Sequence, residues 1–223
     1  MKLCIASQGF TTPEIANEIV KLVGKPLSEI NIAIVNEAPV GLPYNKSKRW
    51  LIKELSYIAD YIGGNIDFVN FRAYDKKEIE KRFEFADIIY LVGGKQHVLA
   101  NLFRRTNTVD LITQCAENKV VMGTSAGSMA LCKQITSETF WRERYALDKN
   151  EVLKNPELGL VNFSIIPHYM REDHLKWDKD FLSKTLEDND FPVYAITDNQ
   201  AIIYNDGEIY FVGGEPEIFG RKQ

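Results

Sequence analysis

Short apolar runs of strand type alternate with amphipathic runs of helical type along residues 1–124, and this alternation restricts the fold more than any other feature. Thr12 and Pro13 are typical of a helix start, and Gly63-Gly64 is typical of a helix end. Strands that alternate with helices form a largely parallel sheet with helices on both faces. The predicted strands are Leu3–Ser7, Asn31–Asn36, Ile66–Phe71, Ala86–Val92 and Val120–Thr124, and the predicted helices are Pro13–Val23, Lys48–Ile62, Lys76–Phe83, Val98–Arg105 and Val109–Asn118.

The rhythm changes after residue 135, because Thr136–Pro156 shows no clean period. Asp206-Gly207 between two apolar runs predicts a tight β-hairpin near the C-terminus. The remaining predictions are a helix at Glu172–Leu186 and strands at Asn162–Pro167, Pro192–Thr197, Ala201–Tyr204 and Glu208–Val212. We therefore expect an α/β fold: a three-layer αβα sandwich with a mostly parallel, doubly wound sheet and a C-terminal β-hairpin.

Composition supports one domain over residues 1–223 and argues against several functional classes. The chain is 45% hydrophobic, which suffices for one sizeable core, and no linker or repeat divides it. The net charge of -4 without a basic stripe argues against nucleic acid. No apolar run approaches the length of a membrane span, and the apolar run at Met1–Ser7 is too short for a signal peptide.

Cysteine usage points to a reducing compartment. The three cysteines are odd in number, widely spaced, and lie in apolar segments: Cys4, Cys115 and Cys132. We expect buried free thiols in a cytoplasmic protein, with neither a disulfide nor a zinc site. Cys132 fits the core better than it fits the role of a nucleophile.

The stretch Gly123-Thr124-Ser125-Ala126-Gly127 lies between a predicted strand and a helix-like run. Strand, Gly-x-Ser-x-Gly and helix in that order form the nucleophile-elbow pattern, in which a tight turn lifts the serine clear of the sheet. A close-packed turn without chemistry is the alternative. The pattern favours Ser125 as a nucleophile.

A serine nucleophile needs a base, and the chain has only three histidines. In open parallel sheets, ligands bind beyond the carboxyl ends of the strands, and His168 follows the predicted strand Asn162–Pro167. His97 lies at the start of a helix, where a protonated imidazole is disfavoured. His174 lies in a charged run typical of a solvated helix face. His168 is therefore the predicted base.

The base in turn needs an acid that fixes its tautomer. Asp198 ends the strand Pro192–Thr197 and is the preferred candidate, with Asp148 and Asp173 as alternatives in charged surroundings. The order serine, histidine, acid differs from that of ordinary α/β-hydrolases, which run serine, acid, histidine.

An oxyanion hole needs two backbone N–H groups aimed at the developing charge. The Ala126 amide, directly after the nucleophile, is one candidate. The turn Gly93-Gly94-Lys95, at the end of the neighbouring strand, can supply the second through Gly94, and glycine lets a substrate approach the backbone there.

Four blocks of the chain together resemble peptidase E, the aspartyl dipeptidase family of serine peptidases. They are similar in spacing along nearly the whole chain, and they read Ala86-Asp87-Ile88-Ile89-Tyr90-Leu91-Val92-Gly93-Gly94, Gly123-Thr124-Ser125-Ala126-Gly127-Ser128, Ile166-Pro167-His168-Tyr169 and Ala195-Ile196-Thr197-Asp198-Asn199-Gln200-Ala201. After the two glycines the family often reads Asn-Thr, whereas this chain reads Lys95-Gln96.

The resemblance implies a fold related to class I glutamine amidotransferases, with Ser125 as nucleophile, His168 as base and Asp198 as acid. It also implies cleavage of dipeptides with an N-terminal aspartate, without metal or cofactor. The Gly-Thr-Ser triplet is also similar to cyanophycinase, a β-aspartyl peptidase, and a non-catalytic binding module on the same fold is a further alternative.

An aspartyl substrate needs a cation near the nucleophile, and arginine matches a carboxylate best. Candidate substrate-binding residues are Gly93, Lys95 and Arg171, with Arg142 and Arg144 as rivals, although most such side chains are solvated. The aromatic segment Phe140–Tyr145 is a candidate lid that would exclude longer peptides. The sequence leaves open whether the chain is a monomer or a homodimer.

Overall fold

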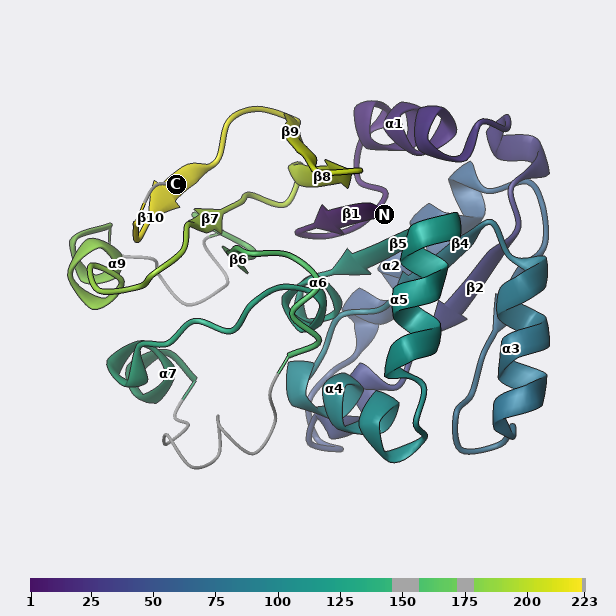
Figure 1. The fold of residues 1–223 in the computed structure, drawn as a ribbon, viewed down its shortest axis with the longest axis horizontal. Coiled ribbons are helices and arrows are strands. Elements are labelled where there is room, and N and C mark those ends of the chain that lie inside the picture. Colours follow the sequence, from purple (N-terminus) through teal and green to yellow (C-terminus); the bar gives the residue numbers. More distant parts are fainter. Residues whose placement is uncertain (146–156, 172–178, 222–223) are drawn as a thin grey trace.

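A seven-stranded sheet forms the centre of the protein (Figure 1). The computed structural model describes residues 1–145, 157–171 and 179–221. The strand order is β3-β2-β4-β5-β1-β8-β9, and the first five run parallel, whereas β8 is antiparallel to both β1 and β9. Their bounds are β1 Lys2–Ala6, β2 Ile32–Val35, β3 Ile66–Phe68, β4 Ile88–Leu91, β5 Val120–Thr124, β8 Ala201–Asn205 and β9 Glu208–Val212.

Helices cover both faces of this sheet. Side chains of α1 and α2 pack on one face, and those of α3, α4, α5 and α6 pack on the other. The bounds are α1 Pro13–Val23, α2 Arg49–Tyr61, α3 Lys76–Phe85, α4 Gln96–Arg105, α5 Val109–Asn118, α6 Ala126–Leu131, α7 Glu138–Tyr145 and α9 Lys179–Thr185, with 3-10 turns η1 Leu27–Glu29 and η2 Ala38–Gly41. The predicted three-layer αβα sandwich with a mostly parallel sheet and a C-terminal hairpin is confirmed. In the described ranges, no helix is both long and apolar enough to cross a membrane.

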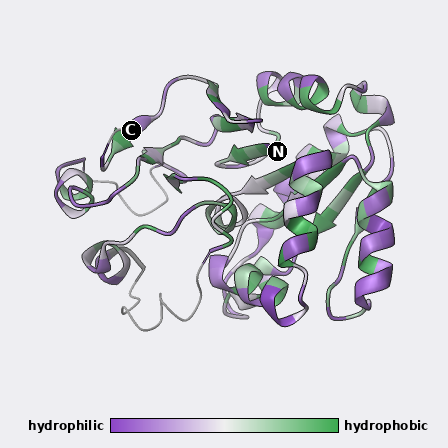
Figure 2. Cartoon of the chain, viewed as in Figure 1, coloured by the Kyte–Doolittle hydropathy of each residue, from purple (hydrophilic) through white to green (hydrophobic). Residues whose placement is uncertain are grey.

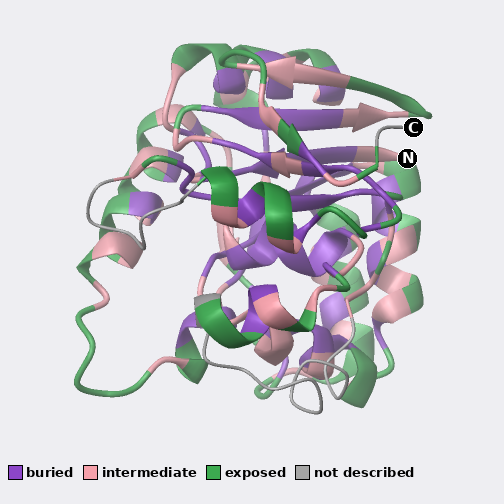
Figure 3. Cartoon of the chain, turned by 90° about the vertical axis from the view of Figure 1, so that its left-hand side faces the viewer, coloured by how far each residue is buried: buried purple, intermediate pink, exposed green. Residues whose placement is uncertain are grey.

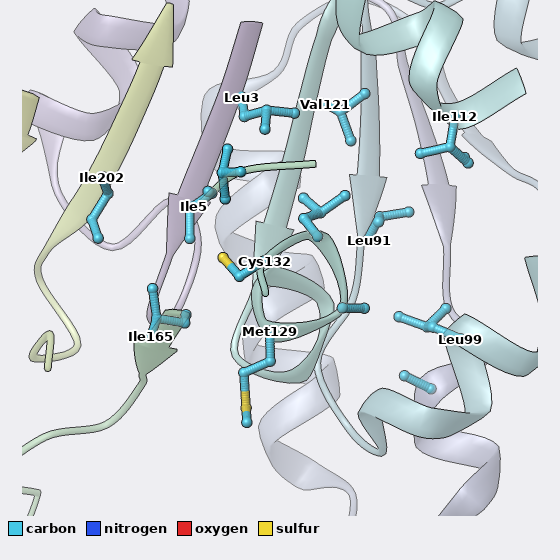
Figure 4. Packing of buried hydrophobic residues seen from close by; sticks show 14 of the residues in the cluster. Leu3, Ile5, Leu91, Leu99, Ile112, Val121, Met129, Cys132, Ile165 and Ile202 are labelled. Atoms are coloured by element: carbon cyan, nitrogen blue, oxygen red, sulfur yellow. The ribbon is translucent and has the colours of Figure 1, made fainter. Parts of the chain in front are cut away.

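Alternation along the strands explains the two faces. In β1, Leu3 and Ile5 point into the cluster under α4 and α5, where Figure 4 shows them beside Val121 and Leu91. Cys4 and Ala6 point to the opposite cluster under α1 and α2. Because both faces are covered, the central strands are buried (Figure 3), while the helices keep hydrophilic outer faces (Figure 2).

Local signals fix the first helix as predicted. The Ile15 N–H donates to Thr12 Oγ1 at 3.4 Å, Pro13 occupies the first turn, and Gly24 ends the helix with φ 78°. A side-chain cap at the start and a left-handed residue at the end satisfy backbone groups that the helix leaves unpaired.

Two of the predicted strands lie in a separate three-stranded sheet, which the sequence pattern does not predict. Its order is β10-β7-β6, with β6 Ser164–Ile166 parallel to β7 Val193–Ala195 and β10 Glu217–Phe219 antiparallel to β7. The hairpin of β8 and β9 occupies the edge of the large sheet beside β1. This edge is therefore closed to β6, which pairs with β7 instead.

The segment Phe140–Tyr145, which the sequence analysis considered as a lid, belongs to α7. Phe140 is fully buried and Trp141 is 5% exposed, and the indole N–H of Trp141 donates to Ile135 O at 2.6 Å. These two aromatic rings belong to the hydrophobic core, so they do not form an aromatic loop over a site.

The three cysteines are buried and free, as predicted. Burial raises the pKa of the Cys4 thiol to about 12 and that of the Cys115 thiol to about 11. Burial also raises the pKa of the Cys132 thiol. A buried thiol of this kind is an inert core side chain.

Candidate active site

Ser125 occupies a strained turn between β5 and α6. Its backbone angles are φ 48° and ψ -114°, a conformation that a non-glycine residue adopts only where its surroundings impose it. A side chain at Gly127 would place Cβ 2.1 Å from Leu91 O, and one at Gly123 would place Cβ 2.5 Å from Ser128 N. Close packing on both sides therefore requires both glycines of the Gly-x-Ser-x-Gly pattern.

His168 and Asp198 come from the second sheet. His168 follows β6 and Asp198 follows β7. His168 Nε2 lies 3.0 Å from Ser125 Oγ, and His168 Nδ1 lies 2.5 Å from Asp198 Oδ1. The His168 side chain is 11% exposed and the Asp198 side chain is 24% exposed. The three predicted side chains thus form one hydrogen-bonded chain that crosses from one sheet to the other.

Ser7, directly after β1, contacts all three of these residues, and it is not among the residues predicted from the sequence. Its carbonyl oxygen accepts from the Ser125 N–H at 3.0 Å. Its hydroxyl accepts from the His168 N–H at 2.8 Å and donates to Asp198 Oδ1 at 3.1 Å. Ser7 is fully buried. One feature of the sequence does point to Ser7: it is a hydroxyl residue at the end of an apolar strand, at the edge of the sheet where the site was predicted.

Asp198 accepts hydrogen bonds both at its carboxylate and at its backbone carbonyl. Arg171 Nη1 lies 3.4 Å from Asp198 Oδ2, and Thr11 Oγ1 donates to the Asp198 carbonyl at 2.9 Å. Burial by itself would raise the pKa of Asp198, but the hydrogen bond and charge of His168, the charge of Arg171 and the bond from Ser7 lower it below its usual range. Arg171, a predicted substrate contact, therefore touches the acid.

The turn after β4 lies against the nucleophile. A Cβ at Gly93 would lie 3.1 Å from Ser125 Cβ, and one at Gly94, whose φ is 142°, would meet the Ala38 backbone at 2.5 Å. The Lys95 N–H donates to Ala38 O at 3.0 Å, and hydrogen bonding from the Gly93 backbone lowers the pKa of the Glu54 carboxyl. The backbone groups of Gly93 and Lys95, on either side of Gly94, are therefore engaged in hydrogen bonds within the protein. The Ala126 N–H lies in the first turn of α6, where backbone N–H groups have no acceptor within the helix.

The other candidates lie elsewhere or outside the described residues. His97 is in the first turn of α4. Arg142 lies on the exposed side of α7, with Nη2 3.8 Å from Glu143 Oε1. The description of the structure does not extend to Asp148, Asp173, His174 or the side chain of Arg144.

The family model for peptidase family S51 matches residues 9–212. An uncharacterized peptidase from Pasteurella multocida strain Pm70 is 29% identical over 148 residues, which cover 64% of this chain and 68% of the relative.

Two solved structures share the fold. A candidate peptidase E protein from Listeria monocytogenes EGD-e superposes with a TM-score of 0.70 at 19% identity, over 94% of this chain and 96% of that one. A peptidase from an acI-B1 actinobacterium superposes with a TM-score of 0.66 at 20% identity, over 100% of this chain and 95% of that one. With the family match over most of the chain, the protein belongs to peptidase family S51 and is a serine-type peptidase with a peptidase E-like fold.

Proposed function

We propose that the protein hydrolyses short peptides, chiefly dipeptides with an N-terminal aspartate, through Ser125, His168 and Asp198. The observation that carries this proposal is the continuous chain of contacts from Ser125 Oγ through both nitrogens of His168 to Asp198 Oδ1. Nucleophile, base and orienting acid at hydrogen-bond distance are the requirements for acyl transfer through a serine.

In the proposed reaction, Ser125 Oγ attacks the peptide carbonyl carbon while His168 Nε2 takes the hydroxyl proton. Asp198 holds the proton on Nδ1 and stabilises the imidazolium. The N–H groups of Ala126 and Gly94 bind the oxyanion. His168 then gives its proton to the leaving amine, the C–N bond breaks, and an acyl-enzyme remains. Water, activated by His168, hydrolyses that ester and restores Ser125.

The substrate preference requires a cation, and Lys95 is our candidate. It follows Gly94 directly in the turn that packs on Ser125, whereas the guanidinium of Arg171 contacts the acid. An ammonium there would attract the aspartyl carboxylate of a bound dipeptide. A charge-assisted contact of about 1.5 to 3 kcal/mol corresponds to a preference of roughly 10- to 150-fold.

A substrate panel tests this function: Asp-X and Leu-X dipeptides, a β-aspartyl-arginine peptide and a p-nitrophenyl ester. We expect the wild type to prefer Asp-X and the Ser125→Ala variant to retain its fold but lose turnover. Undiminished turnover by Ser125→Ala would refute the mechanism, and preferential cleavage of β-aspartyl-arginine would indicate a cyanophycinase-like activity instead. A wild type that no fluorophosphonate labels would indicate a binding module.

The Lys95→Ala variant tests the cation separately. We expect it to lose the preference for Asp-X over Leu-X while keeping ester hydrolysis. Lys133→Ala is the matched control, because Lys133 Nζ donates to Asn162 Oδ1 and lies over the Phe191 ring. An unchanged preference in Lys95→Ala would assign substrate recognition to another residue.

A further inference from the structure

A buried carboxyl group lies directly behind the elbow. Glu54 comes from α2 and is 5% exposed. Its Oε1 accepts from Thr124 Oγ1 at 2.5 Å and from the Tyr90 hydroxyl at 3.0 Å. Hydrogen bonding from the Gly93 backbone also lowers the pKa of this carboxyl. One acidic side chain therefore collects donors from the neighbouring strands β4 and β5 and lies against the turn that follows β4.

Thr124 and Gly93 are neighbours in sequence of the nucleophile and of the oxyanion turn, which must keep a fixed separation from each other. Thr124 directly precedes Ser125, and Gly93 directly precedes Gly94. The Gly93 backbone also packs against the Ser125 side chain. Glu54 thus connects the strand that carries the nucleophile to the turn that would bind the oxyanion.

We propose that Glu54 is a positioning residue, which holds the Gly93 amide and the Thr124 hydroxyl so that Ser125 and the oxyanion turn stay aligned for reaction. The oxyanion part of this inference rests on the proposed function. The bridge itself rests on contacts that are independent of any substrate.

Apolar contacts suffice to pack a helix on a sheet. A buried carboxyl group between α2 and the sheet therefore needs a separate explanation. A buried carboxyl must be satisfied by donors, and an ionised carboxylate is an acceptor only. Burial raises the pKa of Glu54 to about 7, against the hydrogen bonds from Thr124, Tyr90 and Gly93. The titratable groups around it are the buried Tyr90 hydroxyl and, beyond that ring, the Cys4 thiol. Protonation turns one carboxyl oxygen into a donor, which weakens the bridge.

Glu18 supplies a matched control within the same chain. It comes from α1, is 8% exposed, and its Oε1 accepts from the Tyr210 hydroxyl at 2.8 Å. Its other oxygen pairs with Lys21. A Glu18→Gln variant therefore disturbs a buried glutamate–tyrosine pair that does not touch the elbow.

The experiment compares Glu54→Gln, Glu18→Gln and Thr124→Val, with the folded fraction checked by thermal unfolding. The first readout is the rate at which a fluorophosphonate labels Ser125, and the second is kcat and KM for an Asp-X dipeptide. We expect Glu54→Gln to lower the labelling rate and kcat about 10-fold with KM unchanged, and Glu18→Gln to change neither.

Thr124→Val keeps the side-chain shape, removes one donor, and provides the same test if Glu54→Gln does not fold. Since both variants break one bridge, the double variant is expected to lose less than the product of the two single losses. Folded single variants with wild-type labelling rates and kcat would overturn the positioning role. If the wild type is labelled at Ser125 but does not cleave Asp-X, the dipeptidase proposal is refuted. The Glu54 proposal would then still be tested by comparing the labelling rates of the variants.

Discussion

The two sheets hold their parts of the site by different means. The large sheet carries Ser125 in a turn where Gly123 and Gly127 leave no space for a Cβ, so steric contact fixes the nucleophile. The small sheet carries His168 and Asp198, whose placement depends on hydrogen bonds. Steric contacts between backbones do not respond to the loss of one polar group, whereas a hydrogen-bonded arrangement does. The placement of the base and acid thus depends directly on single polar groups, whereas the backbone of the elbow does not and has Glu54 as its polar contact.

The carboxyl groups near the nucleophile and near the base also differ, because their pKa values are shifted in opposite directions. Glu54, behind the nucleophile, has a pKa raised to about 7, because burial outweighs its hydrogen bonds. Asp198 has a pKa below its usual range, because the contacts from His168, Arg171 and Ser7 outweigh burial. One carboxyl is held by neutral donors and the other by donors that include cations, so the two respond oppositely to pH.

The largest expected effect comes from removing either end of the contact between the two sheets. Ser125→Ala and His168→Ala should each lower kcat for Asp-X by about 10⁶, and the double variant should lose no more, because the two groups act as one unit. Steady-state kinetics of the three variants provides the measurement. Losses that multiply in the double variant would mean that nucleophile and base act separately.

Asp198→Asn should cost less, about 10⁴ in kcat, because the imidazole stays in place but its tautomer is no longer fixed. The Asp190→Asn variant is a control, since the Asp190 carboxylate pairs with Arg221 at the surface. A loss in Asp198→Asn below 10-fold would show that another acid orients His168.

The opposite pKa shifts predict opposite effects of pH on the free energy of unfolding. The pKa of Glu54 is higher in the folded state than its ordinary 4.5, so the unfolded state releases the proton first and stability falls as pH rises from about 4.5 to 7, by about 3 kcal/mol at most. The pKa of Asp198 is lower in the folded state than its ordinary 3.8, so its contribution is present above that value and is lost as pH falls through the folded pKa.

Urea unfolding at a series of pH values separates the two groups. Glu54→Gln should flatten the stability profile between about pH 4.5 and 7, and Asp198→Asn should flatten only its acid end below about pH 4. A Glu54→Gln profile parallel to that of the wild type would refute the raised pKa.

Ser7→Ala should have the smallest effect of the series, about 10-fold in kcat, because it removes the hydroxyl bonds to His168 and Asp198 but keeps the carbonyl that accepts from Ser125. Ser128→Ala is its matched control, since Ser128 is equally buried and its hydroxyl donates to Ala6 O at 2.8 Å. Equal losses in the two variants would point to packing rather than alignment of the base.

Local chemistry explains which elements the sequence predicted well. α1 and α5 begin and end at the predicted residues, and so do β5 and β9. Thr12, Pro13 and Gly24 mark the bounds of α1, and the Asp-Gly turn marks the hairpin. The separate small sheet was not predicted, because it depends on which strand occupies the open edge of β1. Contacts between segments that are distant in the sequence determine which strand pairs with β1, so no local sequence pattern predicts it.

The same distinction applies to the site. Ser125, His168 and Asp198 were found because each follows an apolar strand and the rule on strand ends brings them together. Glu54 was missed because polar helix residues are usually assigned to the solvated face. Its position gave a signal, since it shares the stripe of Leu51, Leu55 and Ile58, and only Glu54 and Ile58 are buried in α2. An acid within an apolar stripe is therefore a mark of a buried polar network.

The burial of all three cysteine sulfur atoms has a practical consequence for spectroscopy. At neutral pH the raised pKa values of Cys4, Cys115 and Cys132 leave almost no thiolate for maleimide or iodoacetamide dyes. A cysteine introduced at Met170, which is 66% exposed in the loop after His168, would thus be the sole labelling position. A fluorophore or spin label there could follow the base-bearing loop in the native chain without first removing any cysteine.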